Sequence, residues 1–166
     1  MTEEMNEISA KRVYDTLCTA LDEIELKYDK KEDDLAIYFI MQGEDIPMDF
    51  IIQVHQKPAI VHLISPLPFK IEEEKIPQIA MAVCAANNAL LNGAFDLDMQ
   101  MKRISFRMSL SYYDSLLGKE NLKKMVGASV GMTDDFNDMF LMLNKGMISL
   151  DNFLETINRN VSRKSE

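Results

Sequence analysis

Residues 94–110 of the 166-residue chain, AFDLDMQMKRISFRMSL, hold its clearest pattern. Apolar and polar residues alternate on both sides of residues 101–102, and a period of two residues is typical of β-strands. With a turn at these two residues, Phe95 lies opposite Met108, and the apolar side chains line one side of the pair. The stretch therefore predicts an antiparallel hairpin whose apolar side faces a core.

Upstream of the hairpin, the sequence predicts two helices with a run of strands between them. Apolar residues recur at steps of three and four in about residues 5–23 and again in 76–91, which indicates helices with one buried side. The alternating segments between them predict a short edge strand and an antiparallel meander. These strands are expected over residues 25–29, 35–42, 48–55 and 60–64. The strand over 35–42 is apolar at both alternating positions, so we expect it at the centre, with both faces covered.

Downstream of the hairpin the pattern is helical. A seam of apolar residues extends over 122–143, and a shorter helix is expected over 150–157. An antiparallel sheet flanked by helices is an α+β fold, here in the order α-β-β-β(β)-α-β-β-α-α. We expect a single domain over residues 1–166, with a core over about 5–158 and a short flexible tail over 159–166.

The charge of the chain is distributed unevenly. The formal net charge is −9, and residues 1–50 hold 14 acidic and 5 basic residues, whereas the rest holds 13 of each. An acidic chain repels phosphate groups, which argues against nonspecific binding to nucleic acid or to an anionic membrane. The acidic third could steer a basic partner, or it is only a solvated surface.

Targeting signals and cysteine frameworks are not evident. The N-terminus lacks the positive and apolar blocks of a signal peptide, and no apolar run approaches the roughly 18 residues of a membrane span. Cys18 and Cys84 have neither the number nor the spacing of a disulfide framework or a zinc site, and we interpret both as small buried groups. These features predict a cytoplasmic protein with no cofactor.

A family resemblance extends over about residues 10–158. Residues 85–98, AANNALLNGAFDLD, with 104–107, ISFR, and the long helix through Phe136 and Leu143 resemble the bacterial YbjN-domain family. That family is described as sensory transduction regulators and has the fold of type III secretion chaperones. The resemblance implies a small cytoplasmic protein, often dimeric, that binds other proteins in regulatory or chaperone-like roles, and it supplies no catalytic residues.

Motifs for metal binding or catalysis are weak. His55 and His62 fall on neighbouring strands and could hold a metal with Asp49, but no ligand spacing supports this, and sheet histidines are more often surface or hydrogen-bonded residues. Adjacent carboxylates in the acidic clusters point about 100° apart on a helix, which suits solvated charge better than acid–base catalysis. Nucleophile motifs and phosphate-binding glycine loops are also missing. We therefore expect a protein that is not an enzyme.

Two residues near the hairpin are candidates for polar contacts with a ligand or partner, namely Asn87 and Arg107. The predicted register places Arg107 opposite Asp96, which indicates first a cross-strand ion pair. Its planar guanidinium could alternatively hold a carboxylate of a partner or ligand.

The methionines suggest a second candidate surface. Eight of the 13 lie from Met99 onward, and flexible thioethers suit surfaces that fit several partners. On this hypothesis a partner contacts Met132, Phe136, Met139 and Phe140. The alternative is that these side chains simply fill the core under the sheet.

The sequence thus favours a non-enzymatic, chaperone-like protein-binding or regulatory module of the bacterial cytoplasm. We expect a homodimer with an unidentified protein partner, without nucleic acid or membrane. The alternative is a small-ligand sensor with a pocket between the sheet and the helices, near Asn87 and Arg107.

Overall fold

The computed structural model describes residues 3–164, with side chains from residue 8 to residue 158, and its six strands form one antiparallel sheet in the order β1-β2-β3-β4-β6-β5. The strands are β1 (Asp29–Lys31), β2 (Ala36–Gln42), β3 (Pro47–His55), β4 (Ile60–Pro66), β5 (Ala94–Asp98) and β6 (Arg103–Ser111). The helices are α1 (Glu3–Glu23), α2 (Ile76–Ala89), α3 (Lys119–Asn144) and α4 (Leu150–Lys164), with short 3-10 turns η1 (Glu32–Asp34) and η2 (Glu73–Lys75). The predicted α+β class and order of elements are confirmed.

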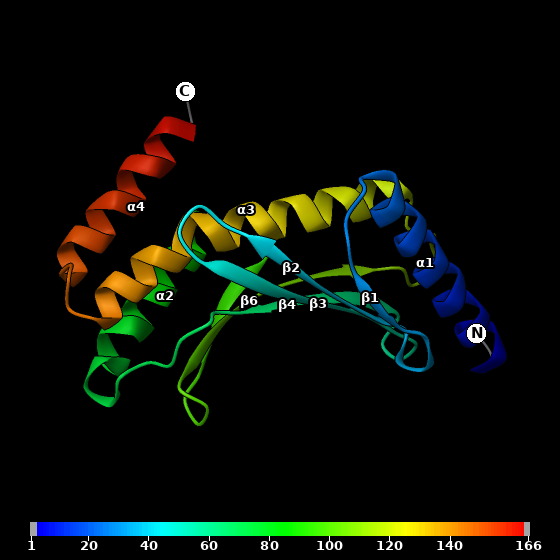
Figure 1. Ribbon diagram of the computed structural model, residues 1–166, viewed down its shortest axis with the longest axis horizontal. Helices are drawn as coiled ribbons and strands as arrows, with labels where there is room; N and C mark the ends of the chain where they lie inside the picture. Colours follow the sequence, from blue (N-terminus) through cyan, green and yellow to red (C-terminus); the bar gives the residue numbers. More distant parts are fainter. Residues whose placement is uncertain (1–2, 165–166) are drawn as a thin grey trace.

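The helices pack on one face of the sheet. Figure 1 shows α3 running along the sheet, with α1 at one end and α2 and α4 at the other. Strand side chains that point toward this layer are mostly buried, as at Phe50, Leu63 and Phe106. The alternate side chains point to the opposite face, which no described helix covers. We call it the open face; its central residues are Tyr38, Ile40, Asp49, Ile51, Ile64 and Arg107.

An aromatic cluster joins the hairpin to α3 and α4. The ring centroid of Phe95 lies 5.2 Å from that of Phe106, 5.2 Å from Phe140 and 5.3 Å from Phe136. Phe140 in turn lies 5.2 Å from Phe153 of α4. Burying one such side chain stabilises a fold by roughly 1.5–3 kcal/mol, and well-oriented ring pairs add about 0.5–1.5 kcal/mol. The cluster therefore fixes two strands and two helices to one another.

The register of the β5–β6 hairpin differs from the predicted one by two residues. Phe95 pairs with Phe106 rather than with Met108. The reason is the turn: the Asp98 carboxylate accepts hydrogen bonds from the backbone N–H groups of Gln100 and Met101, at 2.9 and 2.8 Å, and so closes a longer loop. A shift of two residues keeps every side chain on its predicted face, because the side-chain period of a strand is two.

The prediction that the strand over 35–42 is covered on both faces is wrong. This strand, β2, pairs with β3 along its length but with only three residues of β1, and its second face belongs to the open face. Ile37 and Phe39 are buried beneath the helices, whereas Tyr38 is 39% exposed and Ile40 is 68% exposed. Apolar residues at both alternating positions therefore indicate here a strand with one face left open.

Three smaller expectations also need correction. The edge strand lies at 29–31 rather than 25–29, because the chain leaves α1 through Glu25 with a left-handed φ of 55°. Cys18 is buried as expected, but Cys84 is exposed, since α2 directs Val83 and Ala86 into the core instead. Helix α4 continues past residue 157 to Lys164. Residues 165–166 of the expected tail lie outside the described residues.

Candidate functional site

A row of side chains crosses the open face from one edge of the sheet toward the other. By the strand pairings, Asp29 lies beside Tyr38, Tyr38 beside Ile51, Ile51 beside Ile64, and Ile64 beside Arg107. Directly opposed residues of an antiparallel pair have Cβ atoms about 4.5–5.5 Å apart, so neighbouring side chains touch. The row is apolar in its middle and charged at its ends.

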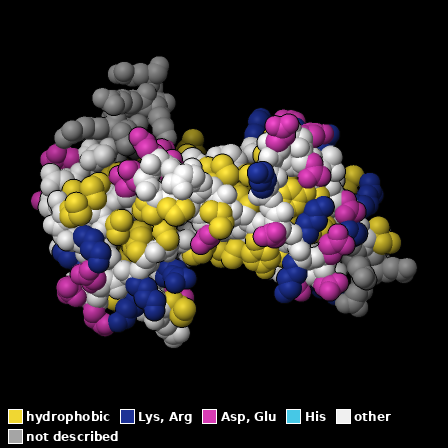
Figure 2. Space-filling model, viewed as in Figure 1, with side chains coloured by type: hydrophobic (Ala, Val, Ile, Leu, Met, Phe, Trp, Pro, Cys, Tyr) yellow, Lys and Arg dark blue, Asp and Glu magenta, His cyan; other side chains and the backbone are white. Residues whose placement is uncertain are grey.

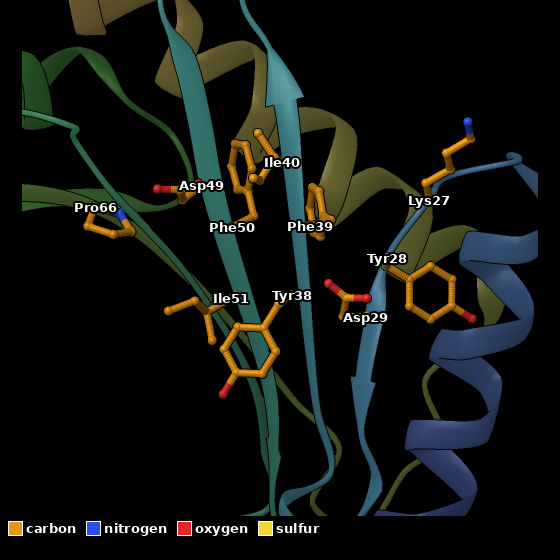
Figure 3. Close-up of a pocket in the computed structure, with 10 residues that line it drawn as sticks. All are labelled: Lys27, Tyr28, Asp29, Tyr38, Phe39, Ile40, Asp49, Phe50, Ile51 and Pro66. Atoms are coloured by element: carbon orange, nitrogen blue, oxygen red, sulfur yellow. The ribbon is translucent and has the colours of Figure 1, made fainter.

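An open concavity of about 630 Å³ lies over the β1–β2–β3 part of this face. It is lined by Lys27, Tyr28, Asp29, Tyr38, Phe39, Ile40, Asp49, Phe50, Ile51 and Pro66. Figure 3 shows Tyr38 and Ile51 next to one another on adjacent strands, with Asp29 on the β1 side of Tyr38. In the neighbouring row Ile40 lies opposite Asp49. Three large apolar side chains therefore form a patch with a carboxylate at each side.

The polar groups of the open face lie toward the hairpin. Arg107 donates a hydrogen bond through Nε to the carboxylate of Asp96, and both side chains are about half exposed. His62 Nδ1 lies 2.8 Å from the hydroxyl of Ser109, and the rings of His55 and His62 are 6.2 Å apart. Burial, followed by the nearby His55 and Arg107, lowers the pKa of His62, which favours a neutral imidazole at pH 7.

The histidines do not form a metal site in the described part of the chain, where no group of three His, Cys, Asp or Glu side chains converges as ligands. Asp49, the third ligand considered with His55 and His62, faces Ile40 instead.

The surface as a whole combines apolar and charged regions. Figure 2 shows hydrophobic side chains gathered across the middle of the view, with Lys, Arg, Asp and Glu concentrated toward the two ends. Exposed apolar residues also occur singly in loops, as at Tyr113, Leu116 and Met147. Single exposed apolar residues are normal on protein surfaces, whereas contiguous ones mark interaction sites. Tyr38 and Ile40 are exposed and adjoin each other and the half-buried Ile51 on the open face.

A second, acidic concavity of about 400 Å³ lies where the β2–β3 turn meets α3 and α4. Glu44 and Asp45 line it from the turn, and Asp134, Asp135 and Asp138 line it from α3. Asp134 Oδ1 accepts a hydrogen bond from the backbone N–H of Glu44 at 3.0 Å, which holds the turn on the helix. Burial raises the pKa of Asp138, and the charges of Asp45 and Asp134 act in the same direction.

A family model covers most of the chain. The model described as "Putative bacterial sensory transduction regulator" matches residues 14–142. The chain belongs to the YbjN family. Among curated proteins, none matches this YbjN-family chain in sequence. Within residues 3–164, its helices include none with the length and apolar character needed to cross a membrane.

Solved structures share the fold of this YbjN-family chain at low sequence identity. The crystal structure of YbjN from E. coli gives a TM-score of 0.59 at 16% identity, covering 76% of this chain and 92% of that one. The ExsC–ExsE complex gives 0.59 at 10% identity, covering 78% and 93%, and the HopA1–SchA chaperone–effector complex gives 0.53 at 17% identity, covering 74% and 91%. The predicted type III secretion chaperone-like fold is confirmed.

The first predicted site residue, Asn87, lies at the outer edge of β5. Its side-chain Nδ2 donates to the Phe95 carbonyl at 2.9 Å, and its Oδ1 accepts from the Phe95 N–H at 2.7 Å. Both ends of the amide are therefore engaged within the fold. Arg107, by contrast, lies on the open face with its ion pair to Asp96. The structure does not bring Asn87 and Arg107 together into one pocket.

The four predicted partner contacts of α3 have different environments. Phe140 is completely buried and Met139 is 8% exposed, and both belong to the core. Met132 and Phe136 are half-buried and pack against that core. The alternative reading, that these residues fill the core, thus describes the positions of Met139 and Phe140. A partner contact through Met132 or Phe136 stays a prediction.

The patch of Tyr38, Ile40 and Ile51 was not among the predicted site residues. The available signal was the strand over 35–42 with two apolar faces. A sequence pattern shows that both faces are apolar, but it does not show whether a helix covers the second face. The order of the strands and the position of the helices supply that information.

Proposed function

We propose that this YbjN-family chain is a non-enzymatic, chaperone-like module that binds a segment of another protein on its open face. The observation that carries the proposal is the apolar patch of the exposed Tyr38 and Ile40 and the half-buried Ile51, which no element of the described chain covers. Antiparallel sheets with one solvated face normally carry polar side chains there. A contiguous apolar patch on that face is therefore suited to a partner.

Two of the structures that share the fold support protein binding, because both are complexes: ExsC with ExsE, and the HopA1–SchA chaperone–effector complex. The family description as a sensory transduction regulator also fits a protein that acts by binding. The open face holds the Asp96–Arg107 ion pair and one hydroxyl–imidazole contact, Ser109 to His62 at 2.8 Å. Among the described residues, no carboxylate hydrogen-bonds to that imidazole to orient it as a base. The proposal accordingly assigns no reaction.

The proposal includes the bacterial cytoplasm as location and a homodimer as assembly. The outer side of α2 offers a second apolar surface, separate from the open face. Met81 is 58% exposed there, Cys84 is exposed, and Leu91 follows the helix in a fully exposed position. This surface is available for a second copy while the open face binds a partner.

A small-ligand sensor near Asn87 and Arg107 has less support. The amide of Asn87 is engaged by Phe95, and Arg107 is engaged by Asp96. Such a ligand would have to displace internal contacts at the first residue and would meet an exposed surface at the second.

Site-specific photo-crosslinking in living bacteria tests the proposal. A photo-reactive residue at Ile40 should give a reproducible protein adduct, because a bound segment lies against that side chain. The same residue at Ala128, exposed on α3, is the matched control and should give no such adduct. Equal adducts at both positions, or an adduct at Ala128 alone, would contradict binding on the open face.

A substitution provides the second arm. Ile40→Ser should remove the adduct formed from a neighbouring position, Tyr38, and should change the free energy of unfolding by no more than about 0.5 kcal/mol, because the side chain is exposed. A variant that folds normally and still forms the full amount of adduct would count against the patch as the contact.

A further inference from the structure

Two carboxylates flank the apolar patch on the open face. Asp29 of β1 lies directly opposite Tyr38, and Asp49 of β3 lies directly opposite Ile40. Both are exposed, and neither forms an ion pair or a side-chain hydrogen bond with another residue of the described chain. By contrast, the exposed Asp34 is paired with Lys31. Asp29 and Asp49 are thus free charges beside an apolar surface.

The one cation that lines the concavity does not neutralise these carboxylates. Figure 3 shows the Lys27 side chain extending away from the patch and from both Asp29 and Asp49. Tyr38, a residue that is 39% exposed, lies between Asp29 and Ile51 in the row. A cation that approached Asp29 could also contact the face of the Tyr38 ring, which attracts cations through its quadrupole.

The acidic character continues beyond the patch. The strand that carries Ile40 leads into the β2–β3 turn, where Glu44 and Asp45 are exposed. A segment lying along β2 would therefore meet carboxylates on both flanks and at the far end. Such a surface repels phosphate and carboxylate groups and attracts ammonium and guanidinium groups.

The spacing of the side chains fits an extended segment. Positions two residues apart in a strand are separated by about 6.7 Å, and the same distance separates alternate side chains of an extended ligand. Tyr38 and Ile40 stand at this spacing on β2, while Ile51 and Asp49 stand beside them on β3.

On the basis of the proposed function, we propose that the segment bound by the open face is extended, basic and apolar. Its large apolar residues contact Tyr38, Ile40 and Ile51. Its flanking Lys or Arg side chains pair with Asp29 and Asp49. A second copy of this chain bound face to face is a poorer occupant. It would set the same unpaired carboxylates against one another.

The size of the effect follows from the exposure of the carboxylates. An exposed ion pair contributes roughly 0.2–1 kcal/mol, so the loss of two weakens binding by about 2- to 30-fold. The loss should shrink when the ionic strength is raised from about 0.05 M to about 0.5 M, since the Debye length falls several-fold.

Selection of random displayed peptides on the immobilised full-length chain tests the proposal. We expect peptides enriched in Lys or Arg next to large apolar residues, and their affinity should fall by the stated factor in the double variant Asp29→Asn/Asp49→Asn. The matched control is Glu74→Gln/Asp151→Asn, which removes the same charge at exposed residues of η2 and α4 and should bind like the wild type. A salt-dependent loss confined to the first variant supports the proposal.

The remaining outcomes overturn it in distinguishable ways. The selected peptides could instead be apolar without enrichment in Lys or Arg, and bind Ile40→Ser more weakly but Asp29→Asn/Asp49→Asn as tightly as the wild type. That result would refute the basic partner and leave the proposed function standing. Peptides insensitive to all of these substitutions, or no selected peptide at all, would count against both. A dimer that Ile40→Ser dissociates would assign the patch to a second copy and so exclude the basic segment.

Discussion

Asn87 shows how one side chain can terminate a sheet. Strand β5 lies at the edge, and an edge strand presents backbone groups that could pair with another chain. The amide of Asn87 pairs with both backbone groups of Phe95, as a neighbouring strand would. The helix α2 and the strand β5 are thereby joined at the position where the aromatic ring of Phe95 enters the core.

Replacing Asn87 should therefore destabilise the fold. Asn87→Ala leaves a partly buried N–H and a carbonyl without partners, and we expect a loss of about 1–3 kcal/mol in the free energy of unfolding. Asn88→Ala is the matched control, because this neighbour is exposed and should change stability by less than about 0.5 kcal/mol. Urea denaturation measures both. Equal values would show that the two hydrogen bonds contribute nothing.

On α3, Phe140 lies in the core, whereas Met132 is only half-buried. Phe140→Ala should cost about 3–5 kcal/mol, because it empties a site among Phe95, Phe136 and Phe153. Met132→Ala, at a half-buried position, should cost clearly less. Thermal unfolding of the two variants gives the comparison. A stable Phe140→Ala variant that has lost a partner would instead support a direct partner contact through this residue.

Asp138 makes stability depend on pH. Its pKa is raised in the folded chain by burial and by neighbouring carboxylates, so ionising it opposes folding. This cost is absent below the unfolded pKa of about 3.9 and appears as the pH rises through the higher folded value. Asp138→Asn should thus stabilise the chain at pH 7, by less than about 1 kcal/mol because solvent screens a half-exposed charge.

The measurement is the free energy of unfolding of Asp138→Asn and wild type at several pH values. The two curves should converge near pH 3, where both side chains are neutral. Asp151→Asn, at an exposed position of α4, is the control and should show no such divergence. A variant that is less stable than the wild type at pH 7 would contradict the sign of the shift.

At the scale of elements, the types and order of helices and strands follow from local periodicity. The register between strands and the face of the sheet that the helices cover do not. The period of two in residues 94–110 gives both strands and the correct faces of the hairpin. The register of the hairpin depends on the length of its loop, and the Asp98 carboxylate sets that length by accepting hydrogen bonds from backbone N–H groups of the turn. A pattern of apolar residues does not encode this interaction. The same limit applies to β2: its residues show two apolar faces, but only the packing of α1 and α3 determines which face is covered.

The turn chemistry can be tested directly. Asp98→Ala removes the acceptor of two backbone N–H groups, and we expect a loss of about 0.5–2 kcal/mol, comparable to the loss of a helix cap. Gln100→Ala, an exposed change in the same loop, should be nearly neutral. Chemical denaturation measures the free energy of unfolding of both variants. If Asp98→Ala is also neutral, another interaction must set the register.

At the scale of the whole molecule, two apolar surfaces are separated by the sheet edge at β5. The open face carries Tyr38, Ile40 and Ile51, and the outer side of α2 carries Met81 and Leu91. In the proposed function the first binds a partner and the second binds another copy. The two roles are separable by substitution because they share no residues.

The dimer leads to a prediction of its own. Met81→Ser/Leu91→Ser should shift the chain toward monomer in sedimentation equilibrium, because it removes exposed apolar surface from α2. Met147→Ser, at a 72% exposed position in the α3–α4 loop, should leave the mass unchanged. A wild-type chain that stays monomeric at high concentration, or a dimer indifferent to both variants, would refute this interface.

The open face also affects how strongly copies of the unliganded chain attract one another in solution. A contiguous apolar patch makes copies adhere, and a net charge of −9 opposes their approach. Near the isoelectric point of about 4.8 this repulsion vanishes, whereas the apolar attraction through Tyr38, Ile40 and Ile51 is unchanged. The acidity of the first fifty residues therefore opposes the association of copies through this apolar patch.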